Sequence, residues 1–187
     1  SPNLETLTPE DRFLQLGLQA RYLFGASASG LGARIDGRLE AREKQPASYP
    51  GFRFTDQAAD FEGLTETLFD GTLDSQGEAS VGWELPPGLK PPSALALGVT
   101  AVVTEGGGRA SRESLTVPVE PYSGYVGLER PEFPWGYAPL GEELAFRYVL
   151  VDREGDPIAG RPLNYRLYQN RGSWWWEYDS YSQFRVR

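Results

Sequence analysis

Residues 14–24 read LQLGLQARYLF, and apolar and polar side chains alternate along most of this stretch. Every second residue from Leu14 is apolar, so a strand here has an apolar face and a largely polar face. The same period of two returns in residues 31–42, where Ile35 and Leu39 alternate with charged side chains. Half-buried strands that repeat in this way predict an all-β fold.

Further strands are expected between the turn signals that follow. They cover residues 61–73, 79–85, 94–105 and 110–119, and the glycine-rich residues 105–109 join the last two as a hairpin. A short strand at Phe52–Phe54 brings the total to about seven over the first ~120 residues, as in an immunoglobulin-like sandwich. We therefore predict an antiparallel β-sandwich domain over residues 1–121.

A second unit is expected over residues 122–187, with its first strand near Tyr125. About 66 residues are too few for a complete sandwich, so we expect this second domain to be incomplete. The chain begins at Ser1 and contains no methionine, and we expect it to be a processed or excised segment of a longer protein.

Two turns share the pattern Asp-x-x-Gly. Asp74 and Gly77 form one, and Asp152 and Gly155 form the other. An aspartate side chain accepts hydrogen bonds from the backbone two residues on, and glycine tolerates the positive φ that such turns need. All four residues are predicted to be turn-forming.

Composition excludes several function classes. The net charge is −8, whereas nucleic-acid binding requires a basic surface. The chain has no cysteine and no histidine, so thiolate chemistry, the commonest general base and the commonest metal ligand are all missing. No serine lies in a nucleophile elbow, and no carboxylate pair stands out by spacing. We predict no catalytic residue, no metal site, no cofactor and no enzymatic activity.

Aromatic residues gather near the end of the chain, at Trp174, Trp175, Trp176 and Tyr178. On a strand, adjacent side chains point to opposite faces, so the three tryptophans cannot share one face. Packing in a core or a domain interface is therefore favoured over a sugar-binding platform. The loop from Arg42 to Asp60 contains two prolines and Lys44, one of only two lysines in the chain, and is expected to be an exposed connector.

Several patches together resemble bacterial alpha-2-macroglobulins. The most specific is residues 20–31 (ARYLFGASASGL), and residues 49–54 (YPGFRF) and 73–79 (LDSQGEA) follow in similar places. Residues 124–128 and 151–158, and the aromatic run at Trp174, resemble parts of the next domain of that family. This resemblance implies tandem macroglobulin-like sandwich domains upstream of the bait region of the family.

The resemblance also implies a function. The full-length protein would be a broad-spectrum endopeptidase inhibitor that traps proteases and protects the cell envelope, and this segment would be part of its scaffold. Its partners would be target proteases, other domains of the same chain and cell-envelope proteins. Its location would be periplasmic, either free or lipid-anchored to the inner membrane. The alternatives are a surface adhesin or carbohydrate-binding β-repeat module using the tryptophan run, and an accessory domain of a secreted hydrolase.

Overall fold

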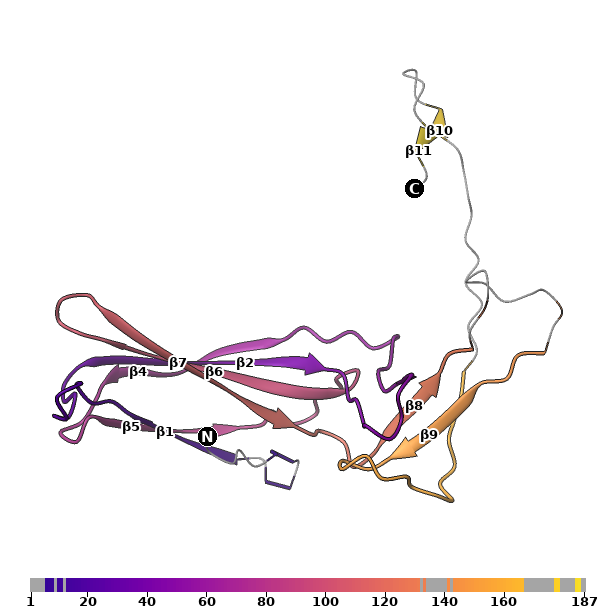
Figure 1. Cartoon of the computed structure of the whole chain (residues 1–187), viewed down its shortest axis with the longest axis horizontal. Coiled ribbons are helices and arrows are strands. Elements are labelled where there is room, and N and C mark those ends of the chain that lie inside the picture. Colours follow the sequence, from indigo (N-terminus) through magenta and orange to yellow (C-terminus); the bar gives the residue numbers. More distant parts are fainter. Residues whose placement is uncertain are drawn as a thin grey trace.

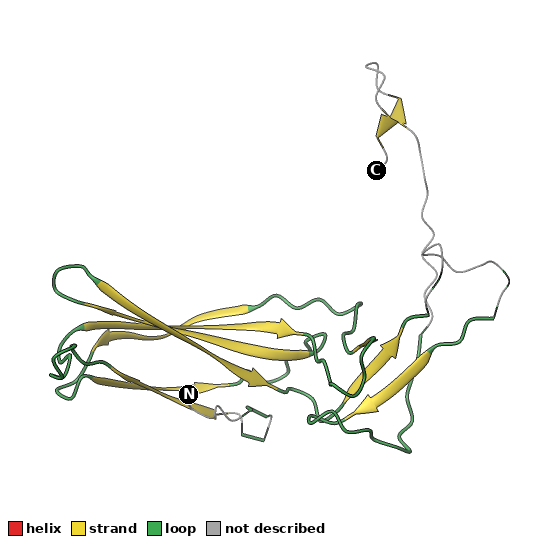
Figure 2. Ribbon diagram, viewed as in Figure 1, coloured by secondary structure: helices red, strands yellow, loops and turns green. Residues whose placement is uncertain are grey.

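The computed structural model describes residues 6–8, 10–11, 13–131, 133, 141 and 143–166. It also describes the backbone of two short paired strands, Glu177–Tyr178 (β10) and Phe184–Arg185 (β11). Within this part of the chain every regular element is a β-strand, and all paired strands run antiparallel, which confirms the all-β prediction (Figure 2). None of these residues forms a helix that could cross a membrane.

The first unit is a sandwich of two facing sheets (Figure 1). The larger sheet has the order β4-β2-β6-β7, formed by Leu64–Thr72 (β4), Gly32–Arg42 (β2), Ala94–Thr104 (β6) and Ala110–Val119 (β7). The smaller sheet pairs Phe13–Gln19 (β1) with Glu78–Glu84 (β5). The predicted sandwich is therefore present, with the predicted strands shifted by only a few residues at their ends.

The core lies between these two sheets because their apolar faces point at each other. In β2, Ile35 and Leu39 are buried, while Arg34 and Arg38, each directly before one of them, are exposed. Leu16 and Trp83 enter the same cluster from the smaller sheet. The period of two in the sequence thus becomes one buried row and one solvated row.

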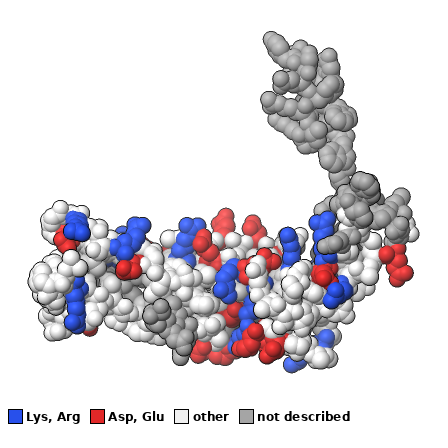
Figure 3. Space-filling view, viewed as in Figure 1, with Lys and Arg blue, Asp and Glu red and all other residues white. Residues whose placement is uncertain are grey.

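Charged side chains cover the outside of the sandwich. Acidic and basic side chains are both spread over the visible face, where they lie close to one another (Figure 3). Arg34, for example, forms ion pairs with Asp36 and Asp70 at 3.0 and 3.1 Å. Such exposed pairs contribute little to stability, so the packing between the sheets carries the fold.

A separate three-stranded sheet, called the second sheet below, lies at one end of the sandwich (Figure 1). Its order is β3-β8-β9, formed by Phe52–Arg53 (β3), Tyr125–Glu129 (β8) and Arg147–Val151 (β9). The sequence predicted a strand at Phe52–Phe54 as part of the first sandwich, and this placement was wrong. The strand pairs with β8 of the second sheet instead, with Phe52 opposite Glu129 and Arg53 opposite Leu128. A strand from inside the first unit thus joins the sheet of the second. The division into residues 1–121 and 122–187 stays a prediction.

Candidate functional site

The tryptophan run, predicted to pack in a core or a domain interface, lies outside the described residues. Trp174, Trp175 and Trp176 belong to the part of the chain that is not described, and Tyr178 is described only through the backbone of β10, opposite Phe184. The carbohydrate-binding hypothesis and the packing hypothesis for these side chains therefore both stay predictions.

The two Asp-x-x-Gly segments adopt the same turn. The Asp74 Oδ1 atom accepts hydrogen bonds from the backbone N–H groups of Gln76 and Glu78 at 2.8 and 2.9 Å. The Asp152 Oδ1 atom accepts in the same way from residues 154, 155 and 156 at 2.8–3.0 Å. Gly77 has φ = +75° and Gly155 has φ = +96°, where other residues are strained.

Gly77 is also tightly enclosed, which leads to a first prediction. A Cβ atom at this position would lie 2.6 Å from the Ala20 carbonyl oxygen and 2.8 Å from the Ala28 nitrogen. We expect Gly77→Ala to lower the free energy of unfolding by about 1–2 kcal/mol through strain at positive φ and by a further ~1–3 kcal/mol through overpacking. Gly88→Ala is the matched control, because Gly88 has the same φ of +75° but no atom within 4 Å of the added Cβ. Equal melting temperatures for the two variants would contradict the enclosed turn.

The junction between the sandwich and the β3-β8-β9 sheet contains a buried cluster separate from the main core. Phe54, which follows β3, is 2% exposed and packs with Ala94 of the sandwich and with Tyr125 and Val151 of the second sheet. Its ring lies over Gly127, where a Cβ atom would come within 2.5 Å of it. An aromatic side chain from the first unit thus fills a space that a glycine in β8 leaves open.

A buried ion pair lies beside this aromatic cluster. The Lys44 Nζ atom is 2.8 Å from the Glu120 Oε1 atom, and both side chains are at most one-tenth exposed. Lys44 Nζ also donates a hydrogen bond to the carbonyl oxygen of Arg153 in the turn after β9, and it lies 5.3 Å from the centre of the Tyr125 ring. One ammonium group therefore contacts the end of the first unit and two elements of the second.

Two more groups link the same elements. The Arg153 guanidinium donates to the Tyr122 carbonyl oxygen at 3.1 Å and forms an ion pair with Glu10 at 2.9 Å. Gly155 lies against Pro46, since an added Cβ would be 3.0 Å from the Pro46 ring. The Asp152 turn, predicted from its sequence pattern alone, is therefore part of the junction.

Tyr125 is the one junction group described here with a strongly perturbed pKa. Burial raises the pKa of its phenol far above the ordinary value near 10, and the neighbouring Glu120 carboxylate raises it further. The folded protein thus holds this proton where the unfolded chain would release it.

This shift predicts a loss of stability in alkali. Above about pH 10 the unfolded state loses the Tyr125 proton and the folded state keeps it, so unfolding becomes more favourable as the pH rises. We expect the wild type to lose up to about 1 kcal/mol more per pH unit than Tyr125→Phe between pH 10 and 11. Urea unfolding at pH 8, 10 and 11 measures the difference. Parallel pH profiles for the two proteins would contradict a buried neutral phenol.

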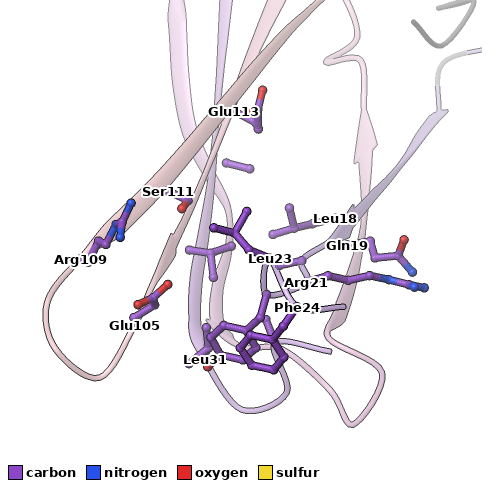
Figure 4. Close-up of a pocket in the computed structure, with 15 residues that line it drawn as sticks. Leu18, Gln19, Arg21, Leu23, Phe24, Leu31, Glu105, Arg109, Ser111 and Glu113 are labelled. Carbon is purple, nitrogen blue, oxygen red and sulfur yellow. The ribbon is translucent and has the colours of Figure 1, made fainter. Parts of the chain in front are cut away.

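A groove of about 440 Å³ lies at the other end of the sandwich, between the β1–β2 connection and the β6–β7 hairpin (Figure 4). Its apolar wall includes Leu18, Leu31 and Val103, and Glu105 and Arg109 lie at the hairpin. Leu23 and Phe24, in the most family-specific sequence patch, are strongly exposed beside it. The groove is a surface feature separate from the junction.

The junction is built from packing contacts, a buried ion pair and hydrogen bonds. Among the described residues, no three His, Cys, Asp or Glu side chains gather closely enough to hold a metal ion. The loop at residues 42–60 was wrongly expected to be a mere exposed connector, because Lys44 and Phe54 are both buried. No sequence pattern marks Lys44 or Glu120; the only signal was a lone lysine next to an aromatic-rich segment.

Comparison with known families gives a consistent result along the chain. Residues 2–121 match the family model for the bacterial alpha-2-macroglobulin MG5 domain, and residues 127–187 match bacterial macroglobulin domain 6. The alpha-2-macroglobulin of Xylella fastidiosa (strain Temecula1) is 32% identical over 167 residues, which cover 87% of this chain and 10% of that protein. That of Escherichia coli K12 is 30% identical over 190 residues, covering 92% of this chain and 11% of that protein.

Solved structures show the same relationship. The structure of Escherichia coli alpha-2-macroglobulin activated by porcine elastase matches with a TM-score of 0.62 and 26% identity, over 83% of this chain and 14% of that one. A trypsin-activated form of the Escherichia coli protein matches with a TM-score of 0.52 and 28% identity, over 66% of this chain and 8% of that one. The chain thus spans about a tenth of the length of its relatives, and it belongs to the bacterial alpha-2-macroglobulin family.

Proposed function

We propose that this chain is a non-catalytic scaffold segment of an endopeptidase inhibitor of the alpha-2-macroglobulin type. The observation that carries the proposal is the match to two consecutive domains of that family along residues 2–121 and 127–187. The related Escherichia coli structures are of forms activated by porcine elastase and by trypsin, which supports proteases as the partners of the full-length protein.

The packing supports a mechanical role within such an inhibitor. The sandwich core is closed, with Leu39, Leu97 and Val117 each at most 1% exposed. The junction to the second sheet is also buried, through Phe54 and the Lys44–Glu120 pair. Elements of this kind transmit a displacement without deforming, because packed cores are stiff. In this proposal, cleavage elsewhere in the protein causes a rearrangement, and the segment transmits the resulting displacement as a stiff unit.

The proposed location is the periplasm, free or anchored to the inner membrane through the rest of the protein. There the inhibitor would protect the cell envelope, and its further contacts would be other domains of the same polypeptide and envelope proteins. Cell fractionation, with an antibody against this segment, tests the location: a signal confined to the cytoplasm contradicts it.

The test of the inhibitor function uses the full-length protein that contains this chain. It is incubated with elastase, and residual elastase activity is measured on a large protein substrate and on a small peptide substrate. A trap is expected to remove most activity on the large substrate and to leave the small one accessible. The size of the inhibitor is measured in parallel, and elastase with a blocked active site is the control for this measurement, since it cannot cleave the inhibitor and should trigger no compaction. Equal activity on both substrates would contradict the proposal.

A further inference from the structure

The two units are joined covalently through residues 121–124, but much of the contact between them comes from another part of the chain. The segment 44–56, between β2 and β4, leaves the sandwich, reaches the second sheet and returns (Figure 1). We call this segment the strap. Its middle contributes β3, which pairs with β8, and this pairing makes the sheet a three-stranded one.

Both ends of the strap are fixed to the first unit by one short stretch of chain. The Lys44 backbone N–H donates to the Ser93 Oγ atom at 3.0 Å, and that hydroxyl donates to the Phe54 carbonyl oxygen at 2.6 Å. The Asp56 N–H donates to the Pro92 carbonyl oxygen at 2.8 Å. Ser93 is 2% exposed, so these bonds are shielded from water and define where the strap begins and ends.

The strap also carries the charge that selects one orientation. Lys44 Nζ binds the Glu120 carboxylate and the Arg153 carbonyl oxygen at the same time. An apolar interface tolerates small rotations, but a buried charge that loses its partner is strongly penalised. A rotation of the second unit would move the Arg153 carbonyl oxygen away from Lys44 and would break the packing contact between Gly155 and Pro46. Lys44, held in place by Glu120, therefore favours a single angle between the units through its bond to Arg153.

We propose that the strap, and not the covalent linker at residues 121–124, makes the two units one rigid body, with Lys44, held by Glu120 at the end of the first unit, setting their relative orientation through the Arg153 carbonyl oxygen. The linker then connects the two units but does not bend between them. Any displacement of the second sheet therefore moves the sandwich with it. This inference rests on the geometry of the junction and holds whether or not the full-length protein traps proteases.

Distance measurements between spin labels test the proposal directly. The chain contains no cysteine, so Glu66→Cys in β4 and Tyr148→Cys in β9 create the only two labelling sites, and both positions are exposed. The background with Lys44 intact should give one narrow distance distribution. Lys44→Met should broaden or shift it, whereas Lys90→Met, the same change at the other and exposed lysine, should leave it unchanged.

Amide hydrogen exchange separates loss of orientation from loss of folding. In Lys44→Met, protection of β8 and β9 should fall by roughly 100-fold or more while the β2 and β6 amides stay protected. If the β2 and β6 amides also lose protection in Lys44→Met, the near-isosteric Glu120→Gln becomes the deciding variant. Glu120→Gln should broaden the distribution of spin-label distances without unfolding the sandwich. A broad distance distribution with Lys44 intact would overturn the proposal. Equal distance distributions in Lys90→Met and in whichever of Lys44→Met or Glu120→Gln keeps the sandwich folded would also overturn it.

Discussion

Lys44→Met is expected to lower the free energy of unfolding of this chain by about 3–5 kcal/mol, because it removes the cation that is hydrogen-bonded to the buried Glu120 carboxylate. Glu120 is 3% exposed, and its Oε2 atom already lacks a hydrogen-bond partner within the described part of the chain. The Arg153 carbonyl oxygen would lose its contact with Lys44 as well. Arg42, at 3.7 Å from Glu120, is too distant to replace the lysine by hydrogen bonding.

Lys90→Met is the matched control for this measurement, since Lys90 is exposed and the change should stay within about 0.5 kcal/mol. Urea unfolding of the two variants and the wild type gives both values. The double variant Lys44→Met with Glu120→Gln should recover part of the loss, because no unpaired charge then remains buried. A Lys44→Met protein as stable as Lys90→Met would show that the pair does not stabilise the junction.

Phe54→Ala is expected to cost about 3–5 kcal/mol, the range for truncating a fully buried phenylalanine. The cavity could not collapse easily, because Gly127 beneath the ring has no side chain and Ala94 is small. Tyr49 and Phe52 would also lose ring contacts at centroid distances of 6.4 and 6.5 Å. The loss should be visible as a lower melting temperature of the whole chain.

Phe24→Ala is the control for this truncation, because Phe24 is 80% exposed and stacks on Tyr22. Its cost should stay below about 1.5 kcal/mol, the upper range for one aromatic pair. If Phe54→Ala melted no lower than Phe24→Ala, the packing of the junction would be contradicted.

The sandwich was predictable because its strands carry their own signal. The alternation in residues 31–42 places Ile35 and Leu39 on the buried face of β2, as found, and the glycines between β6 and β7 mark the hairpin. The end of β1 was less visible. Alternation continues to Phe24, but β1 stops at Gln19 opposite Glu78, where its partner strand begins. Local periodicity does not report the length of a partner strand.

The junction could not be predicted for a related reason. The pairing of Phe52 with Glu129 and the contact of Lys44 with Glu120 each join residues more than 70 positions apart. No turn or spacing rule links such positions, and a lysine in a proline-containing loop is far more often exposed than buried. Sequence analysis identified the Asp152 turn as local chemistry, while its contact with the strap depends on tertiary packing.

As a scaffold, this chain is not expected to be the segment that proteases cut to trigger a rearrangement. The most direct test is to map the first elastase cleavage in the full-length protein by mass spectrometry of samples quenched at early times, alongside size measurements. We expect a first cut outside residues 13–131 and 143–166, followed by compaction while these residues remain intact. A first cut within the strap at residues 44–56, preceding any compaction, would contradict it.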